Sequence, residues 1–245
     1  MADGWFPLSA SLIAHPKFKA ATPMEKIYLL WIISEFNLSG EFYRSDLEIT
    51  IVLKMSISKV RQARKKFQAM EWIQTMPGFR MQGRNLATQY LECGWAAPPV
   101  KGDGVFFAPI QRYTFEHLIA YIRKGWFTHA DVWVYLALWF SLKKYRGDEP
   151  GGFFITKKDL CELTNIPQSD AVKKVERLYN DFMFKGGSHL FEFTDAKFKL
   201  CFKDWSICAV DEKLTANENA CIQKQYSLAK ERREKARKPW TPYPS

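Results

Sequence analysis

The sequence predicts an α+β protein, mainly α with small β-hairpins, in which one structural plan occurs twice. A capping signal followed by a strongly apolar helix stands near the start of each half, at 22–25 (TPME) and at 128–131 (THAD). Each apolar helix is followed by a short strand, a second helix, a turn, a more polar third helix and alternating segments typical of strands. The 245 residues suffice for two domains of about 100 residues each.

The first unit is divided clearly by capping boxes and turns. Its apolar helix is hydrophobic nearly all round, so we expect it at the centre of a core. The expected elements are a helix at 23–36, ended by 37–40, a strand at 41–43, a helix from Ser45 to about Leu53, a turn at 54–56, a helix at 59–70 capped by Ser56 or Ser58, a strand at 72–76, a loop at 77–85 and a return strand at 86–91.

A helix-turn-helix followed by a hairpin is the element order of a winged helix, so the sequence predicts two tandem winged-helix domains. The third helix of the first unit buries Val60, Ala63 and Phe67 through their i, i+3, i+7 spacing, which leaves its cations facing out. Six positive residues and no acidic one lie between Lys54 and Lys66. A merely solvated face, the other interpretation, normally mixes charges of both signs.

This basic helix and the basic loop after it are expected to face one DNA duplex. We expect phosphate contacts from the lysines and the loop arginines, and base contacts from Arg61, Gln62 and Arg64. The candidate DNA-binding residues of the first unit are Ser58, Lys59, Arg61, Gln62, Arg64, Lys65 and Lys66 on the helix, with Arg80 and Arg84 in the loop.

The second unit repeats this order of elements, but its capping and turn signals are weaker. The expected elements are helices at 114–124 and 131–145, a strand at 151–155, a helix at 157–165, a turn at 166–169, a helix at 169–182 and two strands within 184–205. The last of these helices carries Lys173, Lys174 and Arg177 as candidate DNA contacts. It also carries acidic residues, so dimerisation or partner docking remains an equal alternative for this unit.

The chain divides into four predicted regions: winged-helix domain 1 at 1–95, a linker at 96–104, winged-helix domain 2 at 105–210 and a basic helical, Pro-rich tail at 211–245. The linker is expected to set the spacing of the two units over neighbouring major grooves. The tail has two open interpretations, a helix of i,i+4 ion pairs or a DNA-contacting extension.

Composition and motifs limit the function. A net charge of +10 and a pI near 9.3 point to a polyanionic partner. Five cysteines without a CxxC pair favour a reducing, cytoplasmic setting, and no signal peptide or membrane span is expected. No His-x-His, no GxxxxGK[ST] and no convergent acidic pair occur, so we expect no catalysis, no metal and no cofactor.

The first unit resembles the N-terminal winged-helix region of replication initiation proteins from phages and plasmids of Gram-positive bacteria. The stretches that carry the resemblance are GWFPLSASLIAHPKFKAATPMEKIYLLWIISEFN, EFYRSDLE, KVRQARKKF and EWI. Related units occur in DnaD-like primosome proteins. The resemblance covers about residues 4–95, and over 105–205 it rests on the repeated architecture. It implies binding at origin repeats and recruitment of a helicase or helicase loader. The residues carried over are those of the basic helix, Lys59, Arg61, Gln62, Arg64 and Lys65, with Arg80 and Arg84.

Three function classes therefore stay open. The first is a replication initiator that binds double-stranded DNA, and the second is a transcriptional repressor of a mobile element with the same fold. The third is a primosome or helicase-loading adaptor that acts through protein contacts. A homodimer is compatible with each of them, and no membrane partner is expected.

Overall fold

The computed structural model describes residues 4–81, 84–96, 105–146, 152–181 and 198–201, and within them the chain is α+β. The predicted tail at 211–245 and the first of the two strands expected within 184–205 lie outside the described residues. In the first unit the elements are β1 (Trp5–Ser9), α1 (Ala10–Ala14), α2 (Pro16–Lys19), α3 (Pro23–Ser39), β2 (Phe42–Arg44), α4 (Asp46–Leu53), α5 (Ile57–Ala69), β3 (Ile73–Met81) and β4 (Arg84–Cys93). The described elements of the second unit are β5 (Phe107–Gln111), α6 (Arg112–Lys124), α7 (His129–Arg146), β6 (Gly152–Ile155), α8 (Lys157–Thr164), α9 (Gln168–Asp181) and β7 (Phe198–Cys201).

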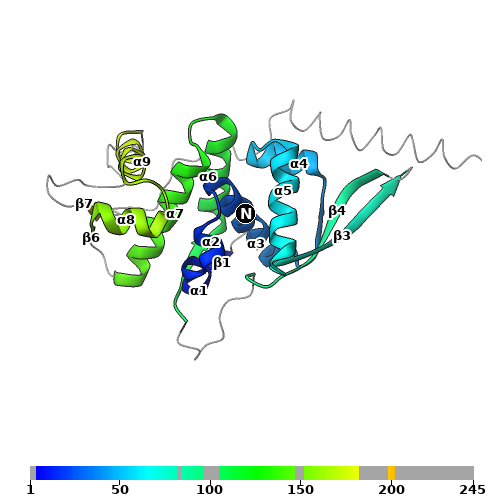
Figure 1. Cartoon of the computed structure of the whole chain (residues 1–245), viewed down its shortest axis with the longest axis horizontal. Coiled ribbons are helices and arrows are strands. Elements are labelled where there is room, and N and C mark those ends of the chain that lie inside the picture. The colour runs from blue at the N-terminus through cyan, green and yellow to red at the C-terminus, as the bar shows by residue number, and fades with distance from the viewer. Residues whose placement is uncertain (1–3, 82–83, 97–104, 147–151, 182–197, 202–245) are drawn as a thin grey trace, which may run out of the picture.

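The apolar helices α3 and α7 form the centre of the molecule, with α8 and α9 at one end and the β3–β4 hairpin at the other (Figure 1). Every side chain from 27 to 33 in α3 is buried, which confirms the expected central position of this helix. The reciprocal hydrogen bonds of Thr22 and Glu25 form the capping box at the start of α3, and Gly40 ends the helix with a positive φ. Local sequence signals therefore fix both ends of this core helix.

The three-stranded sheet of the first unit has the order β2-β4-β3, with antiparallel pairs throughout. The loop predicted at 77–85 is wrong, because pairing continues to Met81 opposite Arg84. Register shifts between Gln74 and Arg80 allow Pro77 and Gly78 to lie within a strand. The hairpin is therefore longer than the alternating pattern of the sequence indicates.

The second unit follows its predicted order closely. Helix α6 begins at Arg112, two residues before the predicted start, and Gln111 gives it no side-chain cap. Instead the Arg112 amide donates to the carbonyl of Gly4 at 2.9 Å, so a neighbouring chain segment satisfies it. Strand β7 pairs with β6 and confirms part of the second predicted strand.

The helix-turn-helix segments of the two units match at the start and at the end of their first helices. Ser45 and Thr156 each cap the first helix of their segment through a complete capping box. Each of those helices ends on a left-handed residue, Lys54 with φ 50° and Asn165 with φ 54°. The two caps and the two left-handed residues have the same spacing, which supports an internal repeat.

The two units are joined directly rather than only through the chain at 96–104. Strand β1 of the first unit pairs with β5 of the second, and Pro7 lies opposite Pro109 at the centre of this ribbon. On either side of the prolines, Phe6 faces Ile110 and Leu8 faces Ala108. The ribbon therefore has a local two-fold arrangement, as expected when two similar units meet through the same strand.

A second set of contacts between the units has the same reciprocity. The ring of His129, at the start of α7, contacts the carbonyl of Leu53 at 2.7 Å. The ammonium of Lys26, near the start of α3, donates to the carbonyl of Thr164 at 3.1 Å. Leu53 and Thr164 are the last residues of α4 and α8, so each unit satisfies a helix end of the other. These contacts, together with the β1–β5 pairing, hold the two units in a fixed relation.

Candidate nucleic-acid interface

Helix α5 begins at a single capping residue. The Ser56 hydroxyl accepts a hydrogen bond from the amide of Lys59 at 3.4 Å, which settles the choice left open between Ser56 and Ser58. Val60, Ala63 and Phe67 are fully buried, which confirms the predicted inner face. Trp72 stacks on Phe67 at 5.7 Å between ring centroids, so the far end of α5 is anchored on the base of the hairpin.

An acidic residue of α4 binds two of the predicted DNA contacts. The guanidinium of Arg64 donates to both carboxylate oxygens of Asp46, at 2.5 and 3.4 Å, and Arg61 Nε donates to Oδ2 at 2.8 Å. The Arg64 side chain is only 14% exposed, against 60% for Arg61. The prediction that Arg64 faces outward is therefore wrong, because its charge is used to join α4 to α5.

This ion pair continues into a buried polar network. Burial acts to raise the pKa of Asp46, but the hydrogen bonds from Arg64 and Arg61 outweigh it and lower the pKa. The hydroxyls of Tyr28 and Tyr90 lie 2.9 Å apart, and Tyr90 is also close to Arg64. The network spans α3, α4, α5 and β4, so it fixes the orientation of α5 on the rest of the unit.

Lys66 is bound in a similar way at the other end of α5. Its ammonium donates to Glu25 of α3 at 2.8 Å, and the Lys66 side chain is 31% exposed. Burial acts to raise the pKa of Glu25, but Lys66 and the amide of Thr22 lower it overall. Glu25 thus both caps α3 and pairs with α5, a dual role that the capping pattern alone did not reveal.

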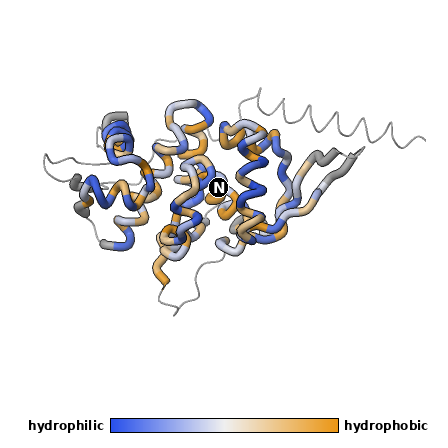
Figure 2. Tube along the Cα trace, viewed as in Figure 1, coloured by the Kyte–Doolittle hydropathy of each residue, from blue (hydrophilic) through white to orange (hydrophobic). Residues whose placement is uncertain are grey.

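One exposed face of α5, which we call the α5 face, carries five polar residues, among them Arg61, whose guanidinium also pairs with Asp46. It stands out as a hydrophilic stretch in Figure 2. Within the described part of the chain, neither Lys59 nor Lys65 has an ion-pair partner on any acidic side chain. The α5 face consists of Ser58, Lys59, Arg61, Gln62 and Lys65.

The two loop arginines lie at the tip of the β3–β4 hairpin. Arg80 is in β3 opposite Asn85, and Arg84 is in β4 opposite Met81. Figure 1 shows this hairpin extending from the body of the first unit beside α5. The backbone therefore places Arg80 and Arg84 on one protruding element.

In the second unit, two of the three candidate contacts are bound inward. Lys174 and Arg177 lie 3.3 and 3.1 Å from the fully buried carboxylate of Asp131 at the start of α7. Arg177 also donates to the carbonyl of Trp126. Lys173 is exposed, but the acidic Asp170 and Glu176 are exposed on the same helix. The outer surface of α9 thus lacks the uniform positive charge of the α5 face.

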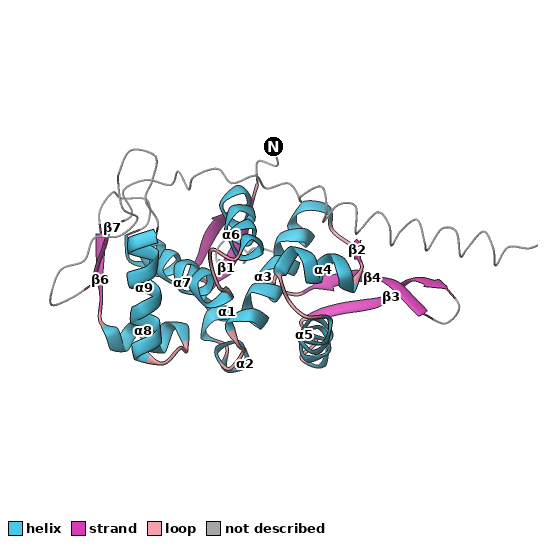
Figure 3. Cartoon of the chain, turned by 90° about the horizontal axis from the view of Figure 1, so that it is seen from above, coloured by secondary structure: helices cyan, strands magenta, loops and turns pink. Residues whose placement is uncertain are grey.

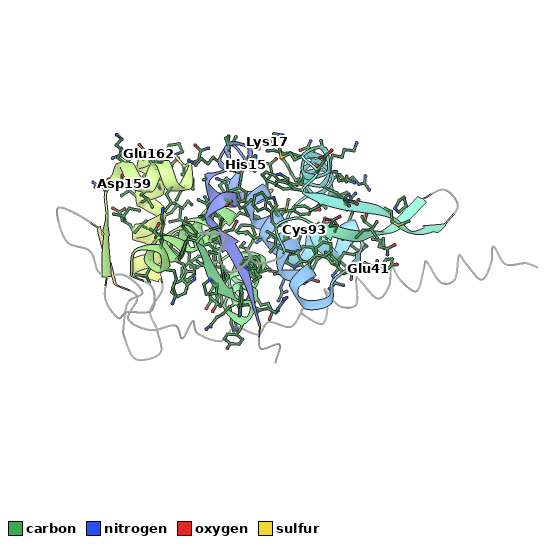
Figure 4. All side chains as sticks on the ribbon, turned by 90° about the horizontal axis from the view of Figure 1, so that it is seen from below. His15, Lys17, Glu41, Cys93, Asp159 and Glu162 are labelled. Atoms are coloured by element: carbon green, nitrogen blue, oxygen red, sulfur yellow. The ribbon has the colours of Figure 1, made fainter. Side chains whose placement is uncertain are left out.

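Sequence reasoning missed a further basic element between the two helix-turn-helix segments. Lys17 and Lys19 of α2 are exposed, and α2 lies on the same side of the molecule as α5 (Figure 3; Lys17 is labelled in Figure 4). The α2 helix contacts both units: the side chain of Asn165 donates to the Lys19 carbonyl at 2.8 Å, and His15 packs edge-on against Trp72. Two lysines in an irregular N-terminal stretch gave no signal of this placement.

Comparisons with known proteins identify no relative: no family model, curated protein or solved structure matches the chain. Among the described residues, no group of three or more His, Cys, Asp or Glu side chains is placed to hold a metal ion. None of the described helices combines the length and apolar character needed to cross a bilayer.

Proposed function

We propose that this chain is a double-stranded DNA-binding protein that reads sequence through α5 of a winged-helix domain. The observation that carries the proposal is the α5 face, a rigidly mounted helix surface with a glutamine and two exposed lysines that pair with no acidic side chain of the described residues. An exposed helix of this composition suits the major groove, where Gln pairs with adenine and Lys or Arg with guanine or phosphate.

The proposal assigns different roles to the cations of α5, according to their exposure and ion pairs. Lys59, Arg61, Gln62 and Lys65 are assigned to DNA, while Arg64 is assigned to positioning α5 through Asp46. The hairpin carrying Arg80 and Arg84 would act as the wing that touches the backbone or the minor groove. Lys59 and Lys65 would supply salt-dependent phosphate affinity, and Arg61 and Gln62 the base discrimination.

The second winged-helix unit has a smaller share in DNA binding under this proposal. With Lys174 and Arg177 bound to Asp131, Lys173 is the one of its three candidates left outward. The fixed contacts between units would give α9 a constant placement relative to α5. Partner docking, a homodimer contact among them, remains the alternative role for this surface.

The biological setting we propose is replication initiation on a phage or plasmid, with recruitment of a host helicase or its loader and without catalysis by this chain. The support is the motif resemblance over the first unit. A repressor would use the same DNA chemistry, and a primosome adaptor would not need it. Selection of bound fragments from the source replicon's DNA at two salt concentrations separates the three. Repeats beside an origin support the initiator, a promoter site favours the repressor, and no enrichment favours the adaptor.

The chemical test uses single substitutions on the α5 face. Lys59→Ala should weaken binding to specific and random duplexes alike and reduce the salt slope by about one. Gln62→Ala should lose about 1–3 kcal/mol of binding free energy on the selected site and much less on random DNA. Lys144→Ala, which removes an exposed lysine at the far end of α7, is the matched control. Binding by both α5 variants equal to that of the control would overturn the assignment of α5.

A further inference from the structure

The structure points to a second nucleic-acid site, away from the α5 face, at the turn between α6 and α7. We propose that Trp126, with Lys54 and Lys124, binds an unpaired nucleotide of single-stranded DNA. The inference goes beyond the duplex reading proposed above and stands on different residues. Trp126 is 56% exposed, the highest value for a large hydrophobic side chain among the described residues. An exposed indole presents a flat aromatic ring on which an unpaired base can stack.

The exposed ring is mounted on a rigid turn. Gly125 ends α6 in the left-handed region at φ 78°, and the Trp126 amide donates to the Tyr121 carbonyl at 3.0 Å. The carbonyl of Trp126 accepts a hydrogen bond from Arg177. Immediately after the turn, Thr128 is held by Asp131 at 2.7 Å. Hydrogen bonds on both sides of the turn therefore fix the backbone of Trp126.

The indole packs against one other ring, and more than half of the residue is exposed. The rings of Tyr121 and Trp126 lie 5.6 Å apart at an angle of 32°, and Tyr121 is buried. A ring backed in this way can accept a second flat ring on its open face without a large loss of side-chain entropy. Base–aromatic stacking of this kind is how proteins bind single strands without reading their sequence.

Two lysines from different elements lie beside the turn that carries this ring. The ammonium of Lys54, on the left-handed turn before α5, lies 2.9 Å from where a Cβ on Gly125 would be. Lys124 is exposed in the last turn of α6. Neither lysine is ion-paired to an acidic side chain in the described ranges, and Asp131, beside the turn, is fully buried by its own partners. An exposed aromatic ring on a turn with lysines beside it suits a base and its phosphates.

The experiment measures binding of fluorescein-labelled dT12 to the full-length chain by anisotropy. Trp126→Ala should weaken binding by roughly tenfold, because one base–aromatic stack is lost, and Trp126→Phe should keep most of it. Trp5→Ala is the matched control: Trp5 is 45% exposed and is already stacked on Phe107. Melting temperatures of all variants verify that they are folded.

A duplex carrying the selected site is titrated in parallel. Loss of dT12 binding with unchanged duplex binding supports the proposal, and Lys59→Ala should show the reverse pattern. Equal dT12 affinity for the Trp126→Ala and Trp5→Ala variants, or no dT12 binding by the unmodified chain, overturns it and leaves the α5 proposal standing. A loss confined to the duplex would reassign Trp126 to a wedge between stacked base pairs and would also overturn it.

Discussion

Replacing Arg64 by alanine tests whether this residue positions α5 or reads DNA. The side chain is 14% exposed and gives two charge-assisted hydrogen bonds to Asp46. Hydrogen bonds to charged groups contribute about 1.5–3 kcal/mol each, and Arg61 would still partly compensate Asp46. We therefore expect Arg64→Ala to lower the free energy of unfolding by about 3 kcal/mol.

The neighbouring Lys65 supplies the control for this substitution. It carries the same charge on the same helix but is exposed and has no ion pair among the described residues. Lys65→Ala should change the free energy of unfolding by no more than about 0.5 kcal/mol while reducing the salt slope of DNA binding by about one. The two variants should thus separate stability from binding.

Urea denaturation followed by circular dichroism measures the stability of both variants, and anisotropy measures their duplex binding well below the midpoint of unfolding. A double substitution, Arg64→Ala with Asp46→Asn, should lose less than the sum of the two single losses, because the residues share one interaction. An Arg64→Ala protein as stable as the unmodified chain but unable to discriminate its site would refute this reasoning. Arg64 would then be assigned to contacts with the DNA bases.

Three further predictions concern charged residues that are buried or ion-paired, and urea denaturation measures the free energy of unfolding in each. Lys26 is buried, and desolvation lowers its pKa to about 8. Because the folded chain loses this proton more readily than the unfolded one, the free energy of unfolding of the unmodified chain should rise by about 3 kcal/mol relative to Lys26→Met between pH 8 and 10.5. Parallel pH profiles of the two proteins would contradict this. The pKa of Glu25 is lowered from its ordinary value of 4.5, so the ionised carboxylate stabilises the fold above pH 4.5. The loss of unfolding free energy caused by Glu25→Gln should therefore be complete at about pH 6 and should shrink as the pH falls below 4.5. A loss that stays constant with pH would exclude this linkage. Asp131→Asn should lower the free energy of unfolding by about 2 kcal/mol at pH 7, because Lys174 and Arg177 lose their buried partner. An unchanged urea midpoint would argue against those ion pairs.

Local signals in the sequence located most of the fold. The Thr22–Glu25 and Ser45–Glu48 capping boxes, the apolar α3 and the i, i+3, i+7 spacing on α5 all depend on residues within one or two turns of each other. Their geometry is set by the backbone of a single element, so the sequence is sufficient to predict them. The hairpin length was not predictable in this way, because bulges let Pro77 and Gly78 lie in a paired strand.

The sequence by itself therefore determined the order of the elements, the buried face of α5 and the basic character of the helix. Only the tertiary structure decided which cations remain available. Arg64, Lys66 and Arg177 look like Lys59 and Lys65 along the chain, yet carboxylates on neighbouring helices bind the first three. Arg61 is intermediate, because it pairs with Asp46 but stays 60% exposed. The tertiary structure likewise decided the β1–β5 ribbon and the placement of Lys54 beside Gly125, the residue before Trp126. Such partners lie far apart in sequence, and a Coulombic contact depends on distance in space, which local periodicity does not encode.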